Sequence, residues 1–172
     1  MTLQGLAPLC APDARLLVLG SMPGTHSLAQ QQYYAHPRNL FWELMYQAQR
    51  APGARQASYT ERCQCLLVQQ VALWDVLHSC RRSGSLDSQI ERDSEQANAL
   101  APFLDQHPHI ERIVFNGNTA WQLFRRHLLS VYPEWATRYQ LIVLPSTSPA
   151  NASQSRLSKQ QRWEQAVWLR AR

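Results

Sequence analysis

The chain of 172 residues lacks the features that mark several large classes of protein. It has a single lysine, Lys159, and no Gly-x-x-x-x-Gly-Lys-Ser/Thr motif, which excludes phosphate chemistry of the P-loop kind. It has no run of about 18 apolar residues, and no basic segment followed by an apolar stretch at its start. We therefore expect neither a membrane span nor a secretory signal, and a cytoplasmic protein.

Cysteine is also scarce. The only closely spaced pair among the four cysteines is Cys63-x-Cys65, and Cys10 and Cys80 stand far from it. This spacing fits neither a zinc site nor an iron-sulfur cluster. In a cytosolic chain such cysteines are reduced thiols with structural roles. We expect no metal and no organic cofactor.

Apolar residues make up 45% of the chain, and no internal repeat is visible. This predicts one domain over residues 1–172, which we expect to be a monomer. The net charge is +5, yet residues 112–172 hold nine basic and two acidic side chains, so they carry +7 and the rest −2. Sixteen of the 17 basic residues are arginine, which suits phosphate oxygens. Either a polyanion partner or a solvated helix face explains this bias.

Short apolar runs that end in Gly, Asn or Pro alternate with helical patterns. Strands are expected at 15–20, 110–117 and 141–145 and around 66–74, and helices at 39–49, 94–106, 118–129 and 155–170. The residues before 14 resemble a lead-in, and 51–60 and 80–93 resemble loops. The alternation predicts a three-layer α/β/α fold with a mostly parallel sheet of about four strands.

In such a fold, ligands bind beyond the carboxyl ends of the strands. Polar or turn-forming residues follow all four expected strands at that edge. They are Ser21 to Gly24, Asp75, Asn116 to Asn118, and Ser146 to Asn151. Asn118 begins the helix after its strand, so we expect it to be an N-cap.

The segment from Tyr33 to Trp42 is the most informative part of the chain. It joins two adjacent tyrosines, a rigid His36-Pro37 step and Asn39 just before an apolar aromatic pair. Pro37 biases His36 toward extended backbone, so a helix should start near Asn39. Phe41 and Trp42 begin an apolar helical run and are expected in the core.

Together with Gly20-Ser21-Met22-Pro23-Gly24, Val71 to Leu77 and Leu144 to Asn151, this segment resembles motifs of the uracil-DNA glycosylase superfamily, and of its hypoxanthine-DNA glycosylase branch above all. The resemblance runs from about Leu16 to Asn151. The first motif alone is common to many folds, whereas the ordered set of four is specific. The resemblance implies a uracil-DNA glycosylase-like fold and hydrolysis of an N-glycosidic bond in DNA.

The resemblance places Asn39 at the catalytic position of the hypoxanthine branch, where an amide orients a water. The first motif offers only Ser21 and Met22 where other branches carry a catalytic Asp or Asn. Asn near a helix start is also a common N-cap, and the two roles can coexist through the two ends of the amide. The turn formed by Ser21, Met22, Pro23 and Gly24 is expected to approach the base, with Gly24 allowing close contact.

Tyr34 matches the aromatic residue that stacks on the flipped base in related enzymes. The alternative is a surface tyrosine packed on the His36-Pro37 turn. Asp75 lies where uracil-specific relatives keep a base-recognising Asn, and its carboxylate can accept a ring N–H. Capping of a helix that begins at Val76 is an equal alternative for Asp75.

The final motif resembles the loop that enters DNA as the base leaves, although Ser146 stands where the best-known relatives have His or Asn. DNA contacts are expected here and on the basic helix that follows, where Lys159 should lie on a solvated face. The DNA-contacting candidates are Ser146, Thr147, Ser148, Pro149, Ala150, Asn151, Arg156 and Lys159.

These features predict a nucleoid-associated, monofunctional DNA glycosylase that acts in base excision repair on double-stranded DNA with a damaged base. Hypoxanthine is the first candidate base, and uracil or xanthine are the alternatives. A non-catalytic module that binds damaged or single-stranded DNA, and a mismatch-specific uracil or thymine glycosylase, are the rival interpretations.

Overall fold

The computed structural model describes residues 1–48 and 53–168. Its centre is a parallel sheet of four strands in the order β3-β2-β6-β7. The strands are β2 (Leu16–Gly20), β3 (Val71–Asp75), β6 (Arg112–Asn116) and β7 (Gln140–Leu144). All four lie within or beside the apolar runs that predicted them. Because they are parallel, their carboxyl ends meet at one edge.

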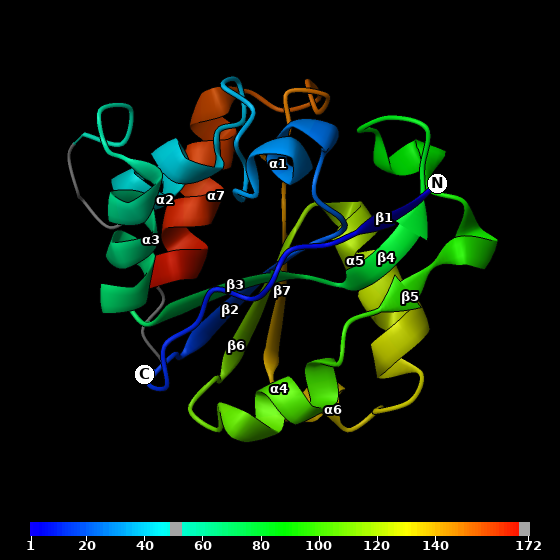
Figure 1. Ribbon diagram of the computed structural model, residues 1–172. Coiled ribbons are helices and arrows are strands. Elements are labelled where there is room, and N and C mark those ends of the chain that lie inside the picture. Colours follow the sequence, from blue (N-terminus) through cyan, green and yellow to red (C-terminus); the bar gives the residue numbers. More distant parts are fainter. Residues whose placement is uncertain (49–52, 169–172) are drawn as a thin grey trace.

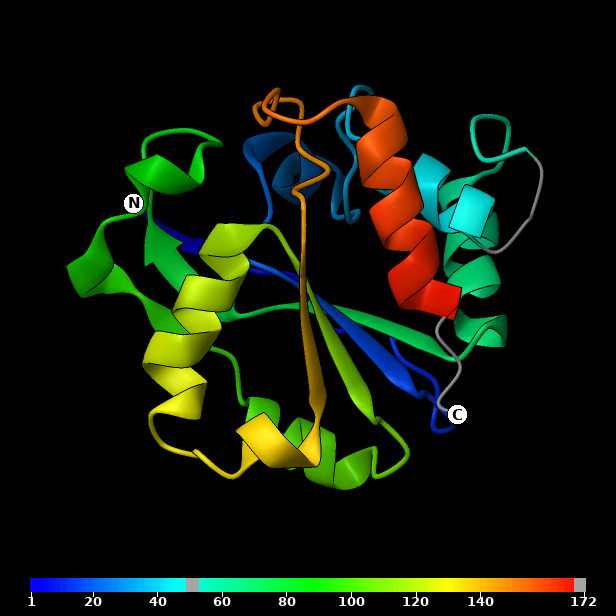
Figure 2. The ribbon, with the colours of Figure 1, turned by 180° about the vertical axis from the view of Figure 1, so that it is seen from behind.

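Alternate residues of each strand serve two separate cores, which is why the strands are apolar throughout. Leu16 and Val18 pack with helices α2 (Phe41–Ala48), α3 (Tyr59–Val68) and α7 (Arg156–Trp168). Leu17 and Leu19 pack on the other face with α4 (Leu100–Gln106), α5 (Asn118–Phe124) and α6 (Trp135–Arg138). Figures 1 and 2 show the helices on opposite sides of the sheet. The three-layer prediction is confirmed.

Helix boundaries differ from expectation in several places. The strand expected around 66–74 begins only at Val71, since α3 extends to Val68. Within the expected 51–60 loop, Ser58 starts α3 through a capping box with Glu61. The expected 94–106 helix begins at Leu100, and the expected 118–129 helix changes from α5 to a π-helical turn at Arg125–Leu129. The expected helix ends at 49 and 170 lie outside the described residues.

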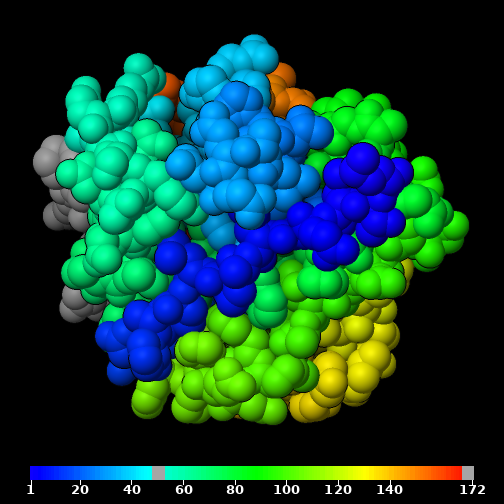
Figure 3. Space-filling view, in the orientation of Figure 1, coloured from blue at the N-terminus to red at the C-terminus, as the bar shows by residue number. Residues whose placement is uncertain are grey.

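A second, antiparallel sheet was not predicted. It consists of β1 (Thr2–Gln4), β4 (Leu77–Arg81) and β5 (Gln96–Ala97) in the order β1-β4-β5. The first residues are thus a strand rather than a lead-in, and they lie across one face of the molecule in dark blue (Figure 3). The expected 80–93 loop contains the end of β4 and two 3-10 turns, Asp87–Gln89 and Arg92–Ser94.

None of the helices in the described part of the chain is long and apolar enough to cross a membrane.

Candidate active site

A cavity of about 610 Å³ opens at the carboxyl-end edge of the parallel sheet. All four sequence motifs contribute to its wall, so the fold brings together residues as far apart as Gly20 and Asn151. This volume is within the usual range for a small-molecule site. The predicted residues that line it are Ser21, Met22, Pro23, Gly24, Tyr34, Asn39, Asp75, Ser146, Thr147, Ser148, Pro149, Ala150 and Asn151.

Asn39 lies just before α2, and its side chain is partly committed to that helix. Its Oδ1 accepts a hydrogen bond from the backbone N–H of Phe41 at 2.9 Å. His36 braces the same turn, because its carbonyl accepts from the Asn39 N–H and its ring Nδ1 accepts from the Arg38 N–H. Asn39 therefore lies one position before the N-cap, Leu40, and the oxygen end of its amide bonds the first residue of α2. Asn39 also lines the cavity.

Tyr34 is half-buried, and it lines the cavity. Its ring stacks on Phe41 with centroids 4.1 Å apart, and Phe41 is fully buried as predicted. Its backbone φ of 50° is left-handed, which is uncommon for a residue with a side chain. The Tyr34 hydroxyl is buried; burial raises its pKa, and the Asn116 side chain opposes that shift.

Gly20 explains how Tyr34 and Asp75 approach each other. A Cβ on Gly20 would lie 2.9 Å from the Tyr34 hydroxyl and closer still to Asp75 Oδ1. Both side chains therefore reach over the bare backbone of this one residue, at the floor of the cavity. A larger residue at position 20 would fill the space that they occupy.

Asp75 is 4% exposed, and its Oδ2 has no hydrogen-bond partner within the described ranges. Burial raises its pKa to about 7, the nearby Asp87 adds to that shift, and Arg82 opposes it. Asp75 thus exists as both acid and carboxylate near neutral pH. The helix-cap interpretation is wrong, since β4 rather than a helix follows at Leu77.

Sequence reasoning missed Asp87 and Arg82. Asp87 accepts a hydrogen bond from the Ser21 hydroxyl at 2.8 Å, and burial raises its pKa. Arg82 is 7% exposed and donates to the Pro23 and Gly84 carbonyls. These bonds fix the Ser21 to Gly24 turn from residues about 60 positions away. The Arg81-Arg82 pair was a signal, but it lies in the polar 80–93 segment, which we expected to be a loop between elements.

The loop from Ser146 to Asn151 is held in place by its own hydrogen bonds and by its neighbours. Asn116 and Thr147 exchange two hydrogen bonds of 2.9 Å, one through each end of the Asn116 amide. The Thr147 carbonyl also accepts from the Leu40 N–H at 3.1 Å, next to Asn39. The residue that follows the catalytic candidate is therefore hydrogen-bonded to the expected DNA-entering loop.

The prediction of a solvated Lys159 is wrong. The residue is 3% exposed, and its Nζ donates to the Asn151 carbonyl at 2.7 Å. Burial lowers its pKa. Trp163, one helical turn later, donates to the Pro145 carbonyl. Lys159 therefore holds the end of the Ser146 to Asn151 loop in place through the Asn151 carbonyl, and it is not an exposed cation that could face DNA.

The basic final third does not form one surface. Arg112 begins β6 and Arg138 ends α6 just before β7, so both lie at the amino-end edge of the sheet, away from the cavity. Arg156 lies closer to the site but pairs with Glu43 of α2, and it does not line the cavity. Asn118, expected as an N-cap, is the first residue of α5, whose N-cap is Gly117.

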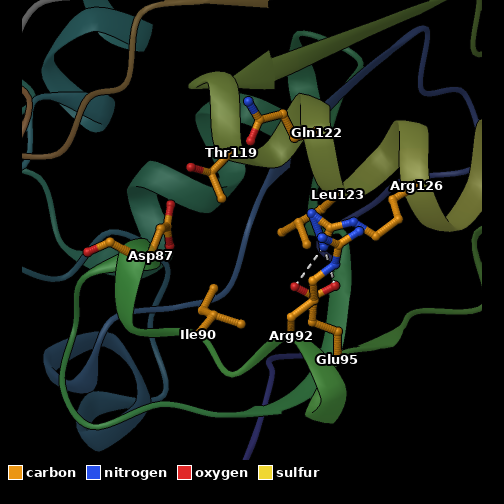
Figure 4. Close-up of a pocket in the computed structure, with 9 residues that line it drawn as sticks. Asp87, Ile90, Arg92, Glu95, Thr119, Gln122, Leu123 and Arg126 are labelled. Atoms are coloured by element: carbon orange, nitrogen blue, oxygen red, sulfur yellow. Dashed lines mark hydrogen bonds and ion pairs between the residues drawn. The ribbon is translucent and has the colours of Figure 1, made fainter.

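A second cavity of about 310 Å³ shares Asp87 and Thr119 with the first. Glu95 lies at its far side, where its carboxylate accepts hydrogen bonds from Arg126 (Figure 4). The same carboxylate is 2.7 Å from His127 Nε2. Arg126 and Asp87 are at opposite ends of this cavity in the view. Within the described ranges, no group of three or more His, Cys, Asp and Glu side chains is arranged to hold a metal ion.

Comparisons with known proteins agree with this geometry. The family model of the uracil DNA glycosylase superfamily matches residues 7–172. Proteins named hypoxanthine DNA glycosylase from Methanosarcina barkeri and Methanosarcina acetivorans are 30% and 31% identical, over 96% and 95% of this chain and 98% and 97% of their own.

A solution NMR structure of a Methanosarcina acetivorans protein, provisionally described as a uracil DNA glycosylase, superposes with a TM-score of 0.81 at 30% identity. The match covers 97% of each chain. With its motifs gathered in one cavity on this fold, the chain belongs to the uracil DNA glycosylase superfamily.

Proposed function

We propose that this DNA glycosylase removes a deaminated base, hypoxanthine first, from double-stranded DNA by hydrolysis of the N-glycosidic bond. The observation that carries the proposal is the placement of the Asn39 amide and the Asp75 carboxyl on one cavity of suitable volume. Two relatives of nearly full length are named as hypoxanthine DNA glycosylases, which supports the same base.

Asp75 is suited to bind the ring edge of the base. Hypoxanthine presents an N1–H donor beside its O6 acceptor. With a pKa of about 7, Asp75 in its acid form can donate to O6 and accept from N1–H, whereas the carboxylate can only accept. Its Oδ2 lacks a protein partner among the described residues, so a bound base would satisfy a group that is otherwise costly to bury.

Asn39 is the candidate for positioning the attacking water. Departure of the base leaves an oxocarbenium-like sugar, and water attacks the sugar carbon, forming a new C–O bond as the C–N bond breaks. The base leaves with the bonding electrons and takes up a proton. A fixed amide lowers the barrier mainly by holding the water in line. The bond from Phe41 to Oδ1 fixes that amide.

Uracil presents an N3–H beside a carbonyl and offers Asp75 a similar edge, so uracil and xanthine remain the alternative substrates. A mismatch-specific enzyme would differ in the opposite base that it requires. We further propose that the enzyme acts in base excision repair and leaves an intact abasic site, because water is the nucleophile.

The test is incubation with duplexes that carry one hypoxanthine, uracil or xanthine, followed by alkaline cleavage of abasic sites. Cleavage at hypoxanthine with at least about tenfold preference supports the assignment. Binding of all three duplexes without base release would favour the non-catalytic module.

A further inference from the structure

Asp75 shares the active-site cavity with a second acidic side chain, Asp87. Asp75 ends β3, whereas Asp87 begins a 3-10 turn in the segment that follows β4. The negative charge of Asp87 raises the pKa of Asp75, so the two carboxyl groups interact with each other. When two carboxyl groups share one site, their charges repel, and one of the two keeps its proton to a higher pH. Which of them keeps it depends on the partners of each.

Asp87 has the kind of partner that stabilises a carboxylate. Its Oδ1 accepts a hydrogen bond of 2.8 Å from the Ser21 hydroxyl, whereas Asp75 Oδ2 has no partner in the part of the chain that the structure describes. A donated hydrogen bond favours the charged form of a carboxyl group. Burial raises the pKa of Asp87, and the bond from Ser21 opposes that rise. The negative charge is therefore more stable on Asp87, and the proton is more stable on Asp75.

One buried cation balances one of the two carboxylates. Arg82 is 7% exposed, and it opposes the rise in the pKa of both Asp75 and Asp87. Since unpaired charge is costly to bury, these three groups are most stable with one carboxyl group as an acid. The other titratable groups near Asp75 in the described ranges are the phenols of Tyr33 and Tyr34. Burial raises the pKa of both phenols, so they are neutral near pH 7 and leave this balance unchanged.

Hydrogen bonds hold Asp87 in place beside the turn that approaches the base. Ser21, which bonds Asp87, begins the turn that leads into α1 (Thr25–Gln30). Two residues before Asp87, the Ser85 hydroxyl accepts from the Thr25 N–H at 3.0 Å. The segment that carries Asp87 is thus bonded to both ends of this turn, which fixes its carboxylate relative to the cavity.

We propose that Asp87 is a positioning residue for base excision, whose fixed negative charge keeps the proton on Asp75. The proposal rests on the proposed function, because Asp75 as an acid can donate to O6 of hypoxanthine and accept from its N1–H, whereas the carboxylate can only accept. Asp87 acts on the base through Asp75. The proposal also gives a role to a negative charge beside a polyanionic substrate, where such a charge otherwise weakens binding.

An NMR titration of the free protein tests the charge of Asp87 without any activity. With isotope-labelled aspartate, the carboxyl carbon of Asp75 is identified by its loss in Asp75→Asn, and it should titrate near pH 7 in the wild type. Asp87→Asn keeps an oxygen for the Ser21 hydroxyl and removes the charge, so it should lower this midpoint by at least about half a pH unit. Asp87→Glu, which keeps the charge, should lower it by less than half as much.

Asp93→Asn is the matched control, because it removes an exposed carboxylate from the same segment, where Asp93 pairs with Arg81. It should leave the midpoint of Asp75 unchanged. An unchanged midpoint in Asp87→Asn, or an equal shift in Asp93→Asn, would overturn the proposal.

Single-turnover excision from hypoxanthine duplex then tests the consequence for the reaction. Asp87→Asn should be at least about threefold slower than the wild type at about pH 8, and within about twofold of it at about pH 5, where Asp75 is an acid in both proteins. In an Asp75→Asn background the same substitution should have no pH-dependent effect, since the amide does not titrate. Equal slowing at every pH would indicate a structural role for Asp87 and overturn the proposal. If the wild type releases no hypoxanthine at any pH, the proposed function fails, and the NMR midpoints still decide whether Asp87 keeps the proton on Asp75.

Discussion

The two neighbouring cavities share Asp87 and Thr119, yet they differ in whether the buried acidic side chain beside each has hydrogen-bond partners in the protein. In the smaller cavity, Glu95 is satisfied by Arg126 and His127. In the larger cavity, the buried Asp75 Oδ2 atom has no hydrogen-bond partner within the described ranges. An unpaired buried polar group is costly, and a bound ligand is one way to satisfy it. We infer that the larger cavity binds a ligand, and that the ion pairs beside the smaller cavity stabilise the fold.

The largest effect should come from Asn39. Asn39→Ala should retain DNA binding and lower single-turnover excision by at least about a hundredfold, the size expected for one positioned catalytic group. Asn39→Asp keeps an oxygen for the Phe41 N–H, but it replaces the Nδ2 donor by an acceptor and adds a negative charge, so it tests the amide donor while the bond to α2 is kept. Asn118→Ala, at an exposed asparagine, is the control. Near-normal excision by Asn39→Ala would remove Asn39 from the mechanism.

A substitution at the smaller cavity should lower stability and leave excision unchanged. Glu95→Gln weakens the interactions with Arg126 and His127, and it should lower the free energy of unfolding by about 1–3 kcal/mol in urea titrations. Excision measured below the unfolding transition should be unchanged. If excision falls while stability holds, the division between the two cavities is wrong.

A substitution of Lys159 tests whether its hydrogen bond to Asn151 holds the loop that lines the larger cavity. Lys159→Met keeps the apolar stem but leaves the Asn151 carbonyl without its donor, at a cost of about 1–2 kcal/mol in stability. We expect weaker duplex binding because the Ser146 to Asn151 loop loosens.

Borohydride treatment of the wild type on hypoxanthine duplex should trap no covalent protein–DNA adduct, since the Lys159 amine is buried and hydrogen-bonded to the Asn151 carbonyl. An adduct that Lys159→Met abolishes would instead make this buried amine the nucleophile and the enzyme bifunctional.

Asp75 predicts a pH dependence of stability. Its pKa is about 7 in the native protein against 3.8 ordinarily, so between these values the native state holds a proton that the unfolded chain has lost. Stability from this group is therefore complete below about pH 4 and falls as pH rises through about 7. Asp75→Asn should exceed the wild type in stability at about pH 8 by roughly 1 kcal/mol or more, and match it at about pH 4. Equal differences at both pH values would contradict the buried-acid assignment.

The smallest effect concerns the basic residues. Arg156 already pairs with Glu43, so Arg156→Ala should weaken binding of all duplexes alike by only a few fold, with about one unit less salt slope if it contacts a phosphate. Arg138→Ala, at the opposite edge of the sheet, should have no effect on DNA binding. A larger loss from Arg138→Ala would place the DNA elsewhere.

The sequence predicted the parallel sheet well because each strand is a continuous apolar run, and burial on both faces is a local property of composition. It did not predict β1, whose Thr2 pairs with Arg81, because pairing over such a separation leaves no local pattern. The start of α3 was visible in principle, since Ser58 and Glu61 form a capping box within the segment interpreted as a loop.

For the site, the motifs located Asn39 and Asp75, which are adjacent to strand ends and helix starts. Their surroundings were not predictable in the same way. The buried state of Lys159 depends on how α7 lies against the loop at Asn151, and the Asp87 bond to Ser21 joins residues 66 positions apart. The charge of residues 112–172 did not predict one basic surface for a similar reason. Arg112 and Arg138 lie at the edge of the sheet opposite the cavity, although they are near Arg156 in the sequence.

The bare backbone of Gly20 constrains how this pocket can change under mutation. Any side chain there collides with both Asp75 and Tyr34, so a first substitution at Gly20 should inactivate the site even where the new residue is as small as alanine. Once both Asp75 and Tyr34 have been shortened, the same change becomes sterically permissible. Laboratory evolution toward another base should therefore acquire substitutions in a fixed order, with the two overlying side chains changing before the glycine beneath them.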